Sequence, residues 1–281
     1  MKINKYNNLL AYSLKNEYVD VYIIPDLGGK IAKIEYNDGF NPVFTKEYDD
    51  YTLPNEPDFA KYDTSGIDDC LPTIDLCEYN GNVLPDHGEI WFNKMTVIEE
   101  DDKHIKLSYD LKSIPITFIK EISIDKNEIN ISYTVRASED THYLWAFHGL
   151  MSLDGCMYIH EPDNTGIVQV DGDTMPLDYC NIKDYKENKT YKFYYKDKLK
   201  EGKITLEYAH HNLHYQFDHN STPYLGVWIT TGGFKGEKNI AIEPCNGYYD
   251  SLVKAIENNK VVKIAKDETH SWYVKLLIER K

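Results

Sequence analysis

INISYTV, residues 129–135, decides the fold class of this chain. Its odd-numbered positions are apolar and its even-numbered positions are polar. Successive side chains of a strand point to opposite faces, so strict alternation predicts a strand with one buried face. Residues 116–124 show a similar alternation, and the polar segment DKNE at 125–128 is suited to join the two strands as a hairpin loop.

The same two-residue period recurs along the chain, at residues 19–23, 105–109, 204–208, 213–217 and 272–276. Helical periodicity is scarce, and the best candidate is a short helix at 251–258, capped by Asp250 or Ser251. Residues 45–75 are rich in Asp, Tyr and Pro and are predicted to form a long loop region. We therefore expect an all-β, largely antiparallel sandwich with few short helices, as a single domain over residues 1–281.

The composition of the chain disfavours several classes of partner. The chain has 281 residues and a net charge of −15, which disfavours binding to nucleic acid or to an anionic membrane surface. The first residues, MKINKYNNLLAYSL, lack the apolar stretch of a signal peptide, and no apolar run is long enough to span a membrane. The five cysteines are odd in number and show no CxxC spacing. We expect reduced thiols in a cytoplasmic protein, either a monomer or a homodimer.

Three segments carry residues suited to acid–base chemistry. LPDHGEIW (84–91) places His87 between two carboxylates in a predicted bend, and YLWAFHGLMSL (143–153) places His148 in an apolar strand. NIAIEPCNGYYD (239–250) places Glu243 directly after an apolar strand, which Pro244 is expected to end because proline donates no hydrogen bond. Each residue alone is more often structural, so it is their joint occurrence that indicates a site.

These segments together resemble one family. The HG of LPDHGEIW, the FHG at 147–149 and the IEP at 242–244, followed by a glycine and an aspartate, are similar in order and spacing to motifs of the aldose 1-epimerase (galactose mutarotase-like) family. Three more segments resemble the family's N-terminal strand, the segment before its first histidine and the strand before its glutamate: IPDLGGKIAKI (24–34), GIDDCLPTID (66–75) and YLGVWITTGG (224–233). The resemblance covers residues 19–278.

The resemblance implies a β-supersandwich that binds a sugar in an open groove. The family's general acid falls on His148, its general base on Glu243 and its substrate-positioning histidine on His87. The implied reaction interconverts the α and β anomers of an aldose by opening and reclosing the ring. One group removes the proton of the anomeric hydroxyl and another protonates the ring oxygen. The reaction has no redox step, so no nicotinamide, flavin or other cofactor is expected. No metal is expected either, because the chain has no zinc-site spacing.

The expected protonation states follow from the residue types. The ordinary histidine pKa lies near cellular pH, and a nearby carboxylate such as Glu243 is expected to favour protonated His148. Partial burial is expected to raise the pKa of Glu243 and improve it as a base. Sugar hydroxyls and the apolar ring face need polar and aromatic partners. The candidates are Asp86, Asp69, Asp68, Trp91, Trp228, Tyr248 and Asp218.

Several departures from the family pattern leave the substrate open. No arginine occurs before residue 136, and a glutamate follows the first HG. Phe147 stands where the family has an asparagine, and KDE (266–268) replaces a PGE-like turn. The missing arginine weakens a hexose-6-phosphate epimerase hypothesis, although Lys30 could act as a point charge.

Other functions remain as alternatives. A sugar-binding protein without catalysis, and an epimerase acting at another carbon, fit the same segments. The histidines at 210, 211, 214 and 219 could share one metal ion only if their strand bends, and no zinc-site spacing occurs. No nucleophile elbow or phosphate-binding loop is present.

Overall fold

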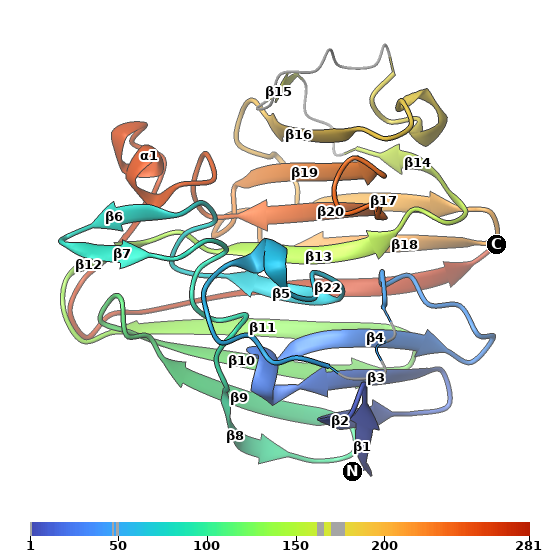
Figure 1. Cartoon of the computed structure of the whole chain (residues 1–281), viewed down its shortest axis with the longest axis horizontal. Coiled ribbons are helices and arrows are strands. Elements are labelled where there is room, and N and C mark those ends of the chain that lie inside the picture. Colours follow the sequence, from blue (N-terminus) through green and yellow to red (C-terminus); the bar gives the residue numbers. More distant parts are fainter. Residues whose placement is uncertain (1, 47, 49–50, 162–165, 170–177) are drawn as a thin grey trace.

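The computed structural model describes residues 2–46, 48, 51–161, 166–169 and 178–281. Within these ranges the chain forms two large antiparallel sheets that pack on each other (Figure 1). The ten-stranded sheet has the order β1 (Lys2–Tyr6), β2 (Leu9–Lys15), β3 (Val19–Ile24), β4 (Lys30–Tyr36), β5 (Ile67–Cys70), β13 (Ala146–Ser152), β20 (Lys238–Cys245), β19 (Tyr224–Thr231), β16 (Thr190–Tyr195) and β15 (Ile167–Gln169).

The second large sheet has eight strands, in the order β14 (Cys156–His160), β17 (Lys203–Tyr208), β18 (His211–Phe217), β22 (Thr269–Arg280), β11 (Glu128–Ala137), β10 (Ile116–Asp125), β9 (His104–Asp110) and β8 (Thr96–Glu100). Two small sheets pair β12 (Thr141–Tyr143) with β21 (Val262–Ile264), and β6 (Cys77–Tyr79) with β7 (Asn82–Leu84). The described helices are α1 (Leu252–Glu257) and the 3-10 turns Pro25–Leu27, Phe59–Lys61 and Ile182–Asp184. None of the helices in the described residues is long and apolar enough to cross a membrane.

The all-β prediction is confirmed, because every segment with the two-residue period lies within a strand. The hairpin is confirmed as well: β10 and β11 pair from Ile116↔Ala137 to Asp125↔Glu128. Two local predictions are wrong. The expected loop at 45–75 contains the central strand β5, and Pro244 does not end its strand, since β20 continues to Cys245 and pairs with β19 there.

The core lies between the two large sheets, where alternate residues of facing strands meet. Phe118 and Ile131 of the eight-stranded sheet are fully buried there, as are Phe147 and Ile242 of the ten-stranded sheet. The ring of Phe147 contacts Tyr215 of β18 edge-to-face at 6.4 Å, across the layer between the sheets. Because side chains alternate along β13 and β20, the neighbours of Phe147 and Ile242 point to the opposite, outer face.

Candidate active site

The strand register places His148 opposite Glu243 on the outer face of the ten-stranded sheet. β13 and β20 pair at Ala146↔Cys245 and again at Leu150↔Ala241, and counting between these pairs sets His148 against Glu243. The same row continues through the paired strands on both sides, because directly opposite residues share a face. It contains Asp68 of β5, His148, Glu243, Gly226 of β19 and Tyr194 of β16.

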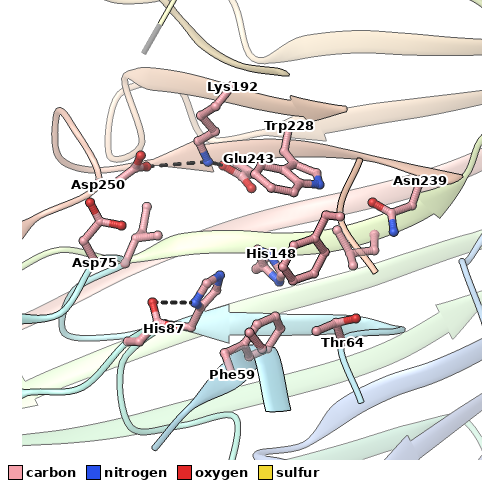
Figure 2. A pocket seen from close by; sticks show the side chains of 15 residues that line it. Phe59, Thr64, Asp75, His87, His148, Lys192, Trp228, Asn239, Glu243 and Asp250 are labelled. Atoms are coloured by element: carbon pink, nitrogen blue, oxygen red, sulfur yellow. Dashed lines mark hydrogen bonds and ion pairs between the residues drawn. The ribbon is translucent and has the colours of Figure 1, made fainter. Parts of the chain in front are cut away.

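Loops cover this face and border an open pocket of about 200 Å³. Figure 2 shows His148 and Glu243 in its middle, Asp75 and Asp250 at one end, and Thr64 and Asn239 at the other. Such a mixture of aromatic walls and converging polar groups is typical of a small-molecule site. The lining residues are Phe59, Ala60, Thr64, Ile74, Asp75, Asp86, His87, His148, Leu150, Lys192, Trp228, Phe234, Asn239, Glu243 and Asp250.

Glu243 is held by its neighbours in the row. Its side chain is 2 % exposed, and Lys192 of β16 donates a hydrogen bond to its carboxylate. Gly226, directly opposite, leaves room for that carboxylate: a Cβ there would lie 3.0 Å from Glu243 Oε2 and 3.2 Å from the Tyr194 ring. Burial raises the pKa of Glu243, and the charge of Lys192 opposes that rise.

Lys192 and Asp250 are site residues that the sequence analysis missed. Lys192 Nζ also lies 3.5 Å from Asp250 Oδ1, and Tyr194 donates a hydrogen bond to the same oxygen. Asp250 and Ser251 were the two candidates for the cap of α1. Ser251 occupies the cap position, without a side-chain hydrogen bond, and the Asp250 side chain lines the pocket instead. A lysine inside the aromatic strand segment TYKFYY was a signal that a buried acid lies nearby.

The protonation state expected for His148 is wrong. His148 is 7 % exposed, and its pKa lies well below the ordinary value, mainly through burial and also through the charges of His87, Lys192 and Lys30. Its row neighbours do not offset this, because Asp68 is paired with Lys30 at 2.9 Å and Glu243 with Lys192. The ligand-free pocket therefore holds a neutral imidazole at neutral pH.

His87 projects from the turn in LPDHGEIW, where the predicted bend is confirmed. The φ angles of His87 and Gly88 are 58° and 72°, and a Cβ at Gly88 would lie 2.2 Å from Leu71 O. Only glycine fits that close approach. His87 Nδ1 lies 3.0 Å from Asp86 Oδ1, and the His87 ring stacks on Phe59 with centroids 4.0 Å apart. These contacts fix the imidazole in the pocket wall.

The His87 ring meets the His148 ring edge-on, with centroids 4.9 Å apart. At the end of the pocket that contains Asp75 and Asp250, burial and the charge of Asp250 raise the pKa of Asp75. The pocket thus brings together a carboxylate, two imidazoles and acidic groups suited to hydroxyls. Groups of these types can remove and deliver protons on a bound ligand.

Of the residues predicted to contact sugar, Asp86 and Trp228 line the pocket, whereas Asp69 and Lys30 do not. Asp69 lies opposite Phe147, so it points into the layer between the sheets. There it forms a fully buried ion pair of 2.7 Å with Lys120 and accepts a hydrogen bond from Trp145 Nε1. Lys30 is 3 % exposed and is engaged by Asp68 and by the Ser65 carbonyl.

Trp91, Tyr248 and Asp218 also do not line the pocket. Trp91 is buried behind it, where its indole donates to Asp86 O at 3.1 Å and its ring packs edge-on against Phe59. Tyr248 is buried among Tyr194, Tyr224 and Tyr249. Asp218 follows β18 of the other sheet, and its carboxylate accepts backbone hydrogen bonds of its own turn, from Asn220 and Ser221.

In the segment considered as a metal site, two of the histidines each pair with a separate carboxylate. His211 pairs with Asp38 at 2.8 Å and His214 with Glu279 at 3.2 Å. Across the residues that the structure describes, no group of three His, Cys, Asp or Glu side chains is placed to hold a metal ion.

No protein-family model and no curated protein matches the sequence. Solved structures do match it over nearly their whole length. A galactose mutarotase-like protein from Clostridium acetobutylicum has a TM-score of 0.72 at 18% identity, with 100% of this chain and 98% of that chain covered. A galactose mutarotase related enzyme from Lactobacillus acidophilus has a TM-score of 0.69 at 13% identity, covering 96% and 97%. An aldose epimerase homologue from C. elegans has a TM-score of 0.66 at 14% identity, covering 96% and 98%. These likenesses establish the fold: this chain has the galactose mutarotase-like fold, as its sequence motifs predicted.

Proposed function

We propose that the protein is a carbohydrate isomerase that interconverts the α and β anomers of an aldose. The observation that carries this proposal is the placement of His148 opposite Glu243 in the middle of one pocket, with His87 on the facing wall. An acid and a base on two sides of one O–C–O unit are what ring opening requires. The shared fold adds support at the level of architecture.

In this mechanism Glu243 removes the proton of the anomeric hydroxyl while His148 protonates the ring oxygen, which opens the ring. The aldehyde then rotates about the bond between C1 and C2. On closure the two residues exchange roles, so that no net proton is consumed. His87, fixed by Asp86 and Phe59, holds a sugar oxygen in the reactive orientation. Each acid or base contributes about 10²–10⁴-fold.

The low pKa of His148 shapes this mechanism. An imidazolium with a depressed pKa is a stronger proton donor, but only a small fraction of molecules carries it at neutral pH. Catalysis is therefore expected to be faster in mildly acidic solution. It is limited at lower pH by protonation of Glu243, whose pKa burial has raised.

The charges of the pocket favour a neutral sugar over a phosphorylated one. Four carboxylates line it, those of Asp75, Asp86, Glu243 and Asp250, against the single ammonium of Lys192. That ammonium is already engaged by Glu243 and Asp250, so a sugar phosphate would meet net repulsion. Hydroxyls of a neutral aldose can instead donate to the acidic side chains, and Trp228 and Phe59 offer apolar walls.

Two-dimensional exchange NMR on a panel of aldoses, with and without the protein, tests this function directly. We expect faster α–β exchange for at least one neutral aldose and none for its 6-phosphate. Glu243→Gln and His148→Asn should each lower turnover at least 100-fold. Asp218→Asn is the matched control, because that carboxylate lies outside the pocket. If exchange were not accelerated for any sugar that binds, the sugar-binding alternative without catalysis would replace this one.

A further inference from the structure

Lys192 occupies an unusual place for a lysine. It is 6 % exposed and lies on the outer face of the ten-stranded sheet, paired with Trp228 of β19. Its ammonium reaches the Glu243 carboxylate on one side and Asp250 on the other (Figure 2). A buried lysine is costly unless opposite charges compensate it, so this position needs a reason beyond packing.

Neighbouring groups fix Lys192 in turn. Tyr194, two residues along β16 and on the same face, donates a hydrogen bond to the Asp250 oxygen that Lys192 approaches. The Lys192 ammonium also lies 5.6 Å from the centroid of the Tyr194 ring. The Asp250 backbone is anchored as well, because its carbonyl accepts hydrogen bonds from the amides of Ile74 and Asp75. The ammonium is thus held by several elements rather than by one flexible contact.

We propose that Lys192 is a positioning residue for the catalytic base: it keeps the Glu243 carboxylate ionised and directed into the pocket, while Asp250 and Tyr194 hold Lys192 in place. This inference rests on the proposed function for its catalytic meaning. Lys192 touches Glu243 rather than the reacting atoms, and it acts through that carboxylate alone. Burial without Lys192 would leave Glu243 protonated and unable to accept the anomeric proton.

Two opposite effects follow from the charges. Loss of the Lys192 ammonium removes an attraction and should raise the pKa of Glu243. Loss of the Asp250 charge removes a repulsion and leaves Lys192 to Glu243 alone, so it should lower that pKa. The titratable groups around Glu243 come from β16, β13, β5, β20 and the covering loops. They are Lys192, Tyr194, His148, Asp68, Cys70, Cys245, His87, Asp75 and Asp250.

The test compares Lys192→Met, which keeps length and apolar stem, with Asp250→Asn, which keeps size. Both are measured by a titration of the Glu243 side-chain carboxyl carbon by NMR, with the signal assigned by its loss in Glu243→Gln. The acid limb of kcat/KM for anomer exchange is measured in parallel. We expect the Glu243 midpoint to rise by at least one pH unit in Lys192→Met and to fall in Asp250→Asn, with the acid limb following each midpoint.

Midpoints that stay within about 0.3 unit of the wild type, or that move in the same direction in both variants, would overturn the proposal. If Lys192→Met does not fold, the downward shift in Asp250→Asn decides alone. The carboxyl titration needs no activity, so opposite shifts in a protein that accelerates no anomer exchange would refute the proposed function and leave the Lys192–Glu243 coupling standing. A purely structural role for Lys192 predicts loss of stability with no shift of the Glu243 midpoint.

Discussion

Replacing Asp69 by asparagine distinguishes a sugar contact from a structural ion pair. By its sequence context Asp69 is a sugar-binding candidate, whereas the structure buries it between the sheets with Lys120. Asparagine keeps the size of the side chain and an oxygen that can accept from Trp145 Nε1. It removes the charge that compensates Lys120, whose ammonium would retain only the Gly29 carbonyl as a strong partner.

The expected cost follows from the geometry of the pair. Both side chains are fully buried and their charged atoms lie 2.7 Å apart, so water cannot replace the lost partner. Removal of one member of such a pair costs about 3–5 kcal/mol of unfolding free energy. For a chain of this length, each kcal/mol lowers the melting temperature by roughly 2 °C, so Asp69→Asn should lower it by about 6–10 °C. Lys120→Met should cost a similar amount.

The assay combines thermal unfolding with anomer exchange measured well below the melting temperature. We expect Asp69→Asn to be destabilised but to keep wild-type kcat/KM, because Asp69 does not line the pocket. The Lys120→Met/Asp69→Asn double variant should recover part of the loss, since no unpaired charge remains. Wild-type stability together with reduced exchange in Asp69→Asn would refute this reasoning and return Asp69 to the sugar site.

Three further predictions concern the pocket itself. The pH profile of kcat/KM should be bell-shaped with its optimum on the acid side of neutrality, because catalysis needs protonated His148, whose pKa burial lowers, together with ionised Glu243, whose pKa burial raises; a flat profile up to pH 8 would exclude the His148 imidazolium as the acid. Gly226→Ala should lower kcat/KM about tenfold, because a Cβ 3.0 Å from Glu243 Oε2 would force that carboxylate to shift; exchange NMR on the folded variant would check it. Trp228→Ala should raise KM about tenfold with little change in kcat, as expected for loss of an apolar wall; an unchanged KM would mean that the sugar does not touch this ring.

The sequence was a good guide to the strands and a partial guide to the site. Alternation is a local property, so segments such as 129–135 could be assigned without knowledge of their neighbours. His87, His148 and Glu243 were found through motifs, and the structure brings them into one pocket. Which strand pairs with which is a long-range property. The neighbours β13 and β20 are distant in the chain, so their register could not be read from either segment.

Orientation accounts for the misplacement of Asp69 among the sugar contacts. Asp68 and Asp69 are adjacent in the sequence and equally acidic, yet they point to opposite faces of β5. If β5 is known to be a strand, the inward direction of Asp69 follows, because Asp69 shares its face with the core residue Ile67. Residues 45–75 lack clear periodicity in sequence, so the strand β5 and the faces of its side chains could not be predicted. An irregular segment gives no parity rule, so both carboxylates had to be treated alike.

The buried charges explain why a lysine was missed. Three carboxylates of the ten-stranded sheet each meet a lysine of another strand: Asp68 with Lys30, Asp69 with Lys120 and Glu243 with Lys192. By charge alone the three pairs are equivalent, and none is visible in sequence, since the partners lie 38 to 51 residues apart. The three pairs differ in whether they are accessible from the pocket. Of the six side chains only Glu243 and Lys192 line the pocket, and only that pair is shared with a further carboxylate. Loss of one member of a pair buried on all sides leaves an uncompensated charge and destabilises the fold. A pair that opens to a ligand can also change protonation during a reaction, which supports Glu243 as the proposed base of this pocket.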